Sequence, residues 1–265
     1  SRGLGDVYKR QILIWAKLAL KDSNWNPSAT HLETIEKLAP ILRHLRHSDA
    51  GLPRFHGSCG DVDGQLDQAL SHAENRETSR NELSVGFARL SNSRTTIIID
   101  AAPPPIGKTS FLADASTLGF EMVSGQRRIF TSCGPGYLFG SDFSSVSRQT
   151  SSHCAVYLEG HNSSHFSEKK VRFQASKNFI TTAPLKVPHE ISTVEGKEIF
   201  EGAHDGYVKS HGLTHVRKLK LAQSGQTFEG QDLLIAIDDV HKRQFDKSLK
   251  SNSSGQFLAN ATFHF

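Results

Sequence analysis

The sequence predicts an α+β chain in which the last helices of a helical domain precede a large antiparallel β-sandwich. Two observations favour this fold class. Between residues 12 and 50, apolar side chains recur at the three- and four-residue spacing of an amphipathic helix. From residue 86 onward the pattern changes to short β-prone runs separated by clusters of Gly, Ser, Asn and Pro. Many short strands at this spacing, without helices between them, are typical of a sandwich.

Residues 1–11, SRGLGDVYKRQ, are expected to lie outside the native protein. They follow neither the order of a signal peptide nor the spacing of an amphipathic helix. They can be back-translated in frame as the end of a transposon-type sequencing adapter, so we interpret them as a non-native, adapter-derived segment. The alternative is a native disordered N-terminus. On the adapter interpretation the chain is a fragment, and the period-two alternation of residues 257–265, which stops without a turn, predicts a C-terminal truncation as well.

Residues 12–50 are predicted to be helical. The apolar segment ILIWAKLAL is followed by the breaker KDSNWNPSA. A further helix is expected to begin at a capping box made by Thr30 and Glu33. Pro40 lies inside its apolar pattern and should kink the helix, because proline removes one backbone hydrogen bond. Residues 51–85, which are rich in Gly, Asp, Ser and Asn, are expected to form a connector with one short element.

Residues 86–265 contain the runs that predict the sandwich. They are VGFARL, TTIIID, TLGFEMV, RRIFTS, HCAVYL, KVRFQA and THVRKLKL. Turn clusters such as SNSR, SGQ, GPG and EGHNSS separate them. The GPG at residues 134–136 indicates a turn rather than a phosphate-binding loop, because no Lys-Ser or Lys-Thr pair follows it.

Composition excludes several classes of function. The formal net charge of +4 is too small to predict a nucleic-acid-binding surface, and no basic run is interleaved with aromatic residues. No apolar run approaches the roughly 20 residues that cross a bilayer, so no membrane span is expected. The three cysteines, Cys59, Cys133 and Cys154, lack C-x-x-C spacing. The odd number of cysteines and the absence of this spacing argue against a disulfide framework and against a thiolate zinc site.

Five blocks, in order, resemble the heparinase II/III-like polysaccharide lyases. They are LAPILRHLRHSDAGLPRFHGS, FARLSNSRTTIIIDAAPPP, ASTLGFEMVSGQRRIFTSCGPG, SSHCAVYLEG and HDGYVKSHGLTHVRKLKL. The resemblance spans nearly all of residues 30–265. It implies the end of an α/α toroid over residues 12–50, an antiparallel β-sandwich over residues 86–265, and a substrate cleft between them. It also implies β-elimination on a uronic-acid polysaccharide, heparan-sulfate-like or alginate-like, and a place in the periplasm or cell envelope.

The implied chemistry needs three kinds of group. One neutralises the substrate carboxylate, a base (Tyr or His) removes the neighbouring proton, and an acid protonates the leaving oxygen. In the family the tyrosine and its Asn or His helper lie on the toroid, which would fall mainly upstream of residue 12. We therefore expect a parent protein that is a carbon–oxygen lyase, and no activity from residues 12–265 alone. The alternative is a non-catalytic carbohydrate-binding or architectural β-sandwich.

Asp114 and His153 are the candidate catalytic residues that the resemblance implies. The family usually has a histidine where Asp114 stands, and an aspartate there repels a substrate carboxylate unless it is protonated or bound to a metal. Asp114 therefore either acts in catalysis or caps a turn. His153 matches the histidine of a Ser-His-Asn-like block, and alternation predicts an exposed polar face shared with Tyr157, a candidate substrate-binding residue. The alternative for His153 is a surface or hydrogen-bonded histidine.

No zinc site of the family's His/Asp/His type is expected, and no cofactor is predicted. Ser116 stands where some family members place a second metal-binding residue, and Ser132 stands where many have Asp or Asn. Only His153 of that set remains, whereas zinc normally needs at least three protein ligands.

His215 and Arg217 are the candidates for binding an acidic polysaccharide, the expected partner. They lie among leucines on one face of LTHVRKLKL, so each must be hydrogen-bonded or lie at a groove edge. Arg217 can clamp a carboxylate or sulfate with two parallel hydrogen bonds. The alternative is a structural pair joined to a strand-end carboxylate such as Asp205 or Asp232. Tyr207 is expected to pack.

Overall fold

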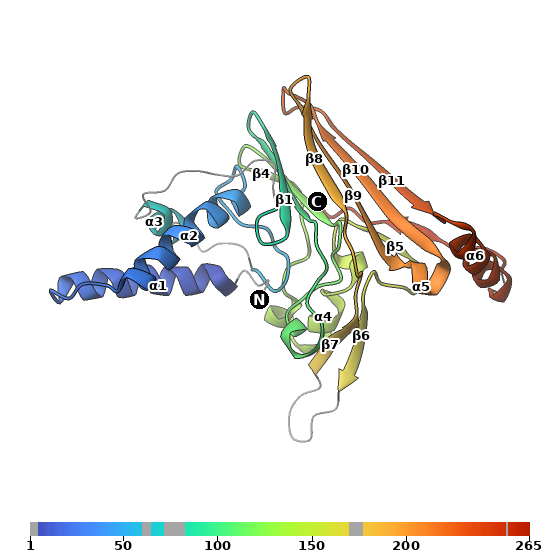
Figure 1. Ribbon diagram of the computed structural model, residues 1–265, viewed down its shortest axis with the longest axis horizontal. Coiled ribbons are helices and arrows are strands. Elements are labelled where there is room, and N and C mark those ends of the chain that lie inside the picture. The colour runs from blue at the N-terminus through green and yellow to red at the C-terminus, as the bar shows by residue number, and fades with distance from the viewer. Residues whose placement is uncertain (1–4, 60–64, 72–82, 170–176, 253) are drawn as a thin grey trace.

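The computed structural model describes residues 5–59, 65–71, 83–169, 177–252 and 254–265, and it places a group of helices beside two facing sheets (Figure 1). The helices that precede the sheets are α1 (Gly5–Asp22), α2 (Ala29–Leu45) and α3 (Gln65–Ser71). The structure thus continues α1 through residues 5–11, which sequence analysis left out of the fold. The adapter interpretation of these residues stays a prediction.

Helix α2 begins before the predicted capping box, because Ser28 is its N-cap. The Ser28 side chain accepts a hydrogen bond from the backbone N–H of His31, with the two atoms 3.2 Å apart. The prediction of a Thr30–Glu33 capping box is therefore wrong, since both residues already lie inside the helix. Pro40 lies within α2 as expected, and the kink there stays a prediction.

Two four-stranded antiparallel sheets form the body of the chain and confirm the predicted sandwich. The first sheet has the order β1 (Phe87–Asn92), β2 (Thr95–Asp100), β3 (Phe120–Ser124), β4 (Arg127–Phe130). The second has the order β11 (Phe228–Ile235), β10 (Leu213–Leu221), β9 (Lys197–Tyr207), β8 (His189–Val194). Two smaller antiparallel pairs join β12 (Ala259–Ala261) to β5 (Val156–Leu158) and β6 (His165–Lys169) to β7 (Lys177–Thr182).

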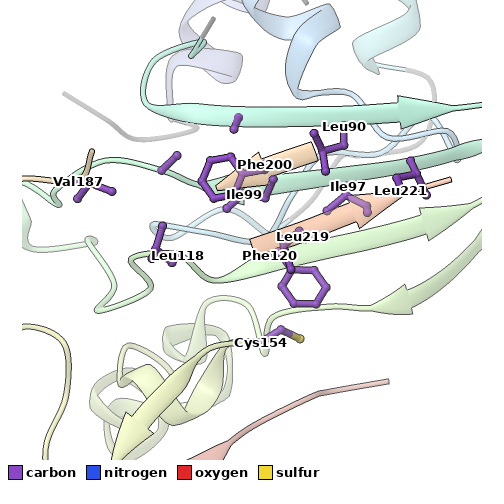
Figure 2. Packing of buried hydrophobic residues seen from close by; sticks show 12 residues of the cluster. Leu90, Ile97, Ile99, Leu118, Phe120, Cys154, Val187, Phe200, Leu219 and Leu221 are labelled. Carbon is purple, nitrogen blue, oxygen red and sulfur yellow. The ribbon is translucent and has the colours of Figure 1, made fainter. Parts of the chain in front are cut away.

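The core lies between the two sheets (Figure 2). Alternate residues of both sheets point into it and are at most 1% exposed: Leu90, Ile97, Ile99 and Phe120 from the first sheet, and Phe200, Leu219 and Leu221 from the second. Strand β10 shows this alternation in its burial, whereas β2 is buried at every residue because α2 and the segment Leu52–Ser58 cover its outer face.

Short helical segments connect the strands. They are η1 (Gly107–Ser110), η2 (Gly136–Phe139), α4 (Ser141–Val146), η3 (Thr150–Ser152), α5 (Val208–His211) and α6 (Asp239–Ser251). Helix α6, with 13 residues, contradicts the expectation of strands without intervening helices. It begins at Asp238, whose side chain accepts a hydrogen bond from the backbone N–H of His241 at 2.8 Å, and none of its residues is buried. The half-buried face of this helix is mostly polar, with Phe245 packed against the cluster of Leu158, Tyr207 and Leu213, so its apolar periodicity is weak.

The segment Leu52–Ser58 is buried against the first sheet, although residues 51–85 read as a connector. Leu52 and Phe55 are at most 1% exposed and pack with residues of α2 and with Phe87 and Ile98. Since Ile97 and Ile99 face the core, Ile98 points to the outer face of this sheet, on the side where α2 lies (Figure 1). None of the helices in the described ranges has the length and apolar character to cross a bilayer.

Candidate functional site

A buried polar centre lies between the segment Leu52–Ser58 and the first sheet. We use this name for five side chains that are at most 4% exposed: His56, Asp100, Asp114, Ser116 and His153. They come from distant parts of the chain, because Asp100 ends β2, Asp114 and Ser116 lie in the loop before β3, and His153 follows η3. The structure therefore brings the two predicted catalytic residues, Asp114 and His153, into one place.

Asp114 is joined to His56 by two reciprocal hydrogen bonds. Its carboxylate Oδ2 accepts the backbone N–H of His56 in a short contact, and its own backbone N–H donates to His56 Nδ1 at 3.0 Å. Because Nδ1 accepts, the proton of neutral His56 is on Nε2, which lies 3.1 Å from Asp100 Oδ2. The Ser116 hydroxyl donates to the same Asp100 oxygen at 2.7 Å. This geometry supports the turn-capping alternative for Asp114, and its catalytic role stays a prediction.

His153 is fully buried, so the prediction that it lies on an exposed polar face is wrong. The alternation on which that prediction rested does not reach His153, because β5 begins only at Val156 and η3 comes directly before the histidine. The ring lies 5.9 Å from that of Phe55, and neither ring nitrogen has a hydrogen-bond partner among the described residues. Tyr157, which lies in β5, is partly exposed.

Burial shifts the pKa values of the two candidate catalytic residues, His153 and Asp114, in opposite directions. Burial lowers the pKa of His153 to about 3. Burial raises the pKa of Asp114 to about 6, although the backbone hydrogen bond from His56 opposes the shift. At neutral pH the pair is thus an imidazole and a carboxylate. His153 Nε2 lies 4.0 Å from Asp114 Oδ2, which is too far for direct proton transfer.

Glu121 fixes the segment Leu52–Ser58 to the sheet, a role that sequence analysis missed. Its Oε1 accepts the backbone N–H groups of Arg54 and Ser132, at 2.9 and 3.0 Å, and Arg128 donates to Oε2 at 3.3 Å. Burial raises the pKa of Glu121, while these two backbone hydrogen bonds act in the opposite direction. The available signal was a charged residue directly after Phe120, inside an otherwise apolar strand.

His215 and Arg217 join Asp232, as the structural-pair alternative stated. Arg217 donates from Nε and Nη2 to the two Asp232 oxygens at 2.7 and 2.9 Å, and His215 Nε2 lies 2.8 Å from Asp232 Oδ1. Both are at most 1% exposed. Asp205 instead accepts a hydrogen bond from the backbone N–H of Leu185. The substrate-binding role predicted for His215 and Arg217 stays a prediction.

A directed chain of hydrogen bonds leads to the same carboxylate. The backbone N–H of Gly206 donates to His204 Nδ1 at 3.1 Å, so neutral His204 carries its proton on Nε2 and donates to His215 Nδ1 at 3.1 Å. His215 then donates to Asp232. Burial lowers the pKa of both histidines, which keeps them neutral. Burial alone would raise the pKa of Asp232, but the hydrogen bonds from His215 and Arg217 outweigh it and lower the pKa.

Tyr207 packs, as predicted. It is 0% exposed, its hydroxyl donates to the backbone carbonyl of Val156 at 2.8 Å, and burial raises its pKa. Within the described residues, no group of three or more His, Cys, Asp or Glu side chains is arranged to hold a metal ion.

Comparisons with known proteins give one family and several relatives. The family model described as heparinase II/III-like, C-terminal, matches residues 75–265. FtsZ-localized protein C of Caulobacter vibrioides (strain NA1000 / CB15N) is 27% identical over 209 residues, which cover 77% of this chain and 35% of the relative. The heparan sulfate lyase HepC from Pedobacter heparinus has a TM-score of 0.57 at 16% identity, covering 86% of this chain and 37% of that one.

A further solved structure, a heparinase III, has a TM-score of 0.52 at 14% identity and covers 83% of this chain and 36% of that one. At such low identities these structures show a shared fold. The chain spans about a third of the length of the relatives that it matches.

Proposed function

The chain belongs to the heparinase II/III-like C-terminal family, and on that basis we propose that it is the sandwich half of a polysaccharide lyase. The match over residues 75–265, which include every strand of both sheets, is the observation that carries the proposal. The proposed substrate of the parent protein is a uronic-acid polysaccharide, heparan-sulfate-like or alginate-like. The proposed reaction is β-elimination, which needs a base, an acid and a group that neutralises the substrate carboxylate.

Helices α1 and α2 are, in this proposal, the end of an α/α toroid. Exposed apolar side chains support it, since Trp15 of α1 is 49% exposed and Trp25, in the segment between the two helices, is 71% exposed. A further layer of helices would cover such side chains. The relatives, about three times as long as this chain, have room for that layer.

We propose that the buried polar centre faces the cleft between sandwich and toroid. It is on the outer face of the first sheet, the side on which α2 lies (Figure 1). His153 is our candidate reacting group of the sandwich, because its ring nitrogens have no hydrogen-bond partner among the described residues. Asp114 is already bonded to His56, so we assign it the positioning of the segment Leu52–Ser58. The base is proposed to come from the toroid.

Tyr157 is our candidate for contact with the sugar, since it alone of the predicted site residues is partly exposed. His215 and Arg217 are buried with their polar atoms on Asp232, so any effect that they have on the substrate passes through the residues that they hold.

A non-catalytic sandwich is the second candidate function. The bonding of Asp114 to His56 favours it, because the side chain that stands at the family's usual histidine position is then structural. The relative FtsZ-localized protein C, whose name places it with FtsZ, favours an architectural role of this kind. The two candidates differ in whether the parent protein forms unsaturated sugar ends.

We predict that the parent protein releases unsaturated uronate from heparan sulfate or alginate and that this chain alone does not. The physical reason is that proton abstraction needs a base within hydrogen-bond reach of the substrate, and the predicted base lies outside the chain. The measurement is the ultraviolet absorbance of the unsaturated ends, with the parent carrying a phenylalanine in place of the toroid tyrosine as the matched control.

Turnover by the folded chain on its own would contradict the proposal. A parent protein that binds these polysaccharides without forming unsaturated ends would favour the second candidate.

A further inference from the structure

We propose that Arg217 is a positioning residue for His153, acting as a strut from strand β10 to the two loops that build the buried polar centre. Arg217 lies in the second sheet, and the centre lies beyond the first sheet. The proposal rests on the proposed function for its meaning in the parent protein, because a positioned His153 matters only if that residue acts on a substrate. The contacts themselves belong to this chain.

One guanidinium nitrogen of Arg217 holds both loops at once. Its Nη1 donates to the carbonyl oxygens of Leu118 and Cys154, each at 2.7 Å. Cys154 directly follows His153, and Leu118 lies near the end of the loop that carries Asp114 and Ser116. Arg217 thus fixes the distance between the two backbone segments whose side chains meet in the centre. Both Leu118 and Cys154 are labelled in Figure 2, where they border the core.

The Leu118 backbone is in a conformation that needs such support. Its φ angle is +62°, in the left-handed region that leucine rarely adopts. Its N–H donates to the Asp100 carbonyl at 2.8 Å, and its own carbonyl is the one that Arg217 holds. Both peptide groups that flank Leu118 are therefore hydrogen-bonded, one to Asp100 of the first sheet and one to Arg217.

The held turn lies directly beside His153. After Leu118 comes Gly119, and a Cβ atom placed there would lie 2.7 Å from the Ser116 carbonyl and 3.5 Å from the Cβ of His153. The lack of a side chain at Gly119 therefore lets the turn lie close to the base of the histidine side chain. A turn that moved outward would free space beside His153, because interiors are close-packed and fill such gaps by side-chain shifts.

The strut is itself held rigidly. Arg217 uses Nε and Nη2 on the two oxygens of Asp232, and four of its five N–H groups are thereby engaged. Asp232 also accepts from His215, the end of the hydrogen-bond chain that begins at Gly206. The guanidinium lies 5.3 Å from the Phe120 ring centre. Lysine, with one nitrogen, cannot reproduce this fork.

The test is the ring signal of His153 in protein labelled with 13C at histidine side chains. In Arg217→Lys we expect the His153 Cε1–Hε1 cross-peak to move, because its ring-current shift depends on the 5.9 Å separation from Phe55. The matched control is Arg89→Lys: Arg89 also donates to two backbone carbonyls, those of His44 and Arg46, and these lie outside the centre. In the control the His153 signal should stay in place.

An unchanged His153 signal in folded Arg217→Lys would overturn the proposal, and so would an equal movement in Arg89→Lys. If Arg217→Lys fails to fold, the same His153 signal is measured in Asp232→Asn, and the same movement is expected. This variant keeps the side-chain volume and one acceptor oxygen. The readout needs no enzymatic turnover. An inactive parent protein would therefore leave this result intact, and a static His153 signal would leave the lyase proposal intact.

Discussion

Replacing Arg217 by methionine is expected to lower the free energy of unfolding by about 3–5 kcal/mol, the range for removing one partner of a buried ion pair. The methionine leaves the carbonyl groups of Leu118 and Cys154 without their donor and leaves Asp232 without its countercharge. Unpaired buried polar groups lose the water that would solvate them and gain nothing in return. Guanidinium chloride unfolding at pH 7, followed by circular dichroism, measures the change.

The control is the double variant Arg217→Met with Asp232→Leu. Replacing both charged partners by apolar residues commonly restores much of the stability. Here we expect partial recovery, because the two carbonyl groups and His215 Nε2 remain without partners. A loss of less than about 1 kcal/mol in the single variant, the range of exposed pairs, would contradict the structural role assigned to Arg217.

Lowering the pH is expected to destabilise the chain through His153, and the variant His153→Phe should remove that part of the effect. The pKa of His153 is about 3 in the folded chain, against a usual value of 6.5, so below pH 6.5 the unfolded chain takes up a proton that the folded chain refuses. The contribution of His153 to stability is complete above pH 6.5 and is lost as the pH falls. It amounts to on the order of 4 kcal/mol between pH 7 and pH 3.

The measurement is the difference in unfolding free energy between the wild type and His153→Phe at several pH values. Phenylalanine keeps a ring beside Phe55, and any packing cost is the same at every pH, so it cancels from the slope. Asp114, with its raised pKa of about 6, acts in the opposite direction in both proteins and also cancels. A difference that stays constant from pH 7 to pH 4 would show that His153 does not lie in a buried, neutral state.

The sandwich could be predicted from the sequence because its strands leave two recognisable patterns. The run TTIIID is β2, which is buried at every residue because both of its faces are covered. The run THVRKLKL lies wholly within β10, where burial repeats every second residue from His215 onward. The same rule failed at His153, because a turn of 3₁₀ helix, η3, comes immediately before it and the alternation starts only at Val156. Extending the strand alternation back beyond Val156 therefore led to the wrong prediction that the buried His153 is exposed.

The sequence could indicate the partner of Arg217, Asp232, but it could not indicate what the ion pair of these two residues does. Two polar residues among leucines require a partner, and Asp232 was one of the two carboxylates considered. The sequence does not indicate the hydrogen bonds from Arg217 to the carbonyl groups of Leu118 and Cys154. These are backbone atoms nearly 100 and more than 60 residues away along the chain. Every residue type carries a backbone carbonyl group, so a backbone acceptor cannot be recognised from a sequence motif.

The buried polar centre escaped prediction for a similar reason. His56 lies in a stretch rich in Gly and Ser that indicates a connector, and only the packing of Phe55 and Leu52 draws it under the sheet. For Asp114 the sequence left two possible roles open, capping or catalysis. The hydrogen bond to the His56 backbone supports the first and could not be read from spacing, because 58 residues separate the two.

Chemical labelling of histidines tests most directly the central claim, that this sandwich encloses His153 in a polar centre away from solvent. Diethyl pyrocarbonate would be applied to the folded chain at pH 7 and the modified histidines located by mass spectrometry. The account predicts that the exposed His165 and His189 are modified while His153 and His215 stay unmodified until denaturant is added. Modification of His153 at the rate of His189 would contradict it.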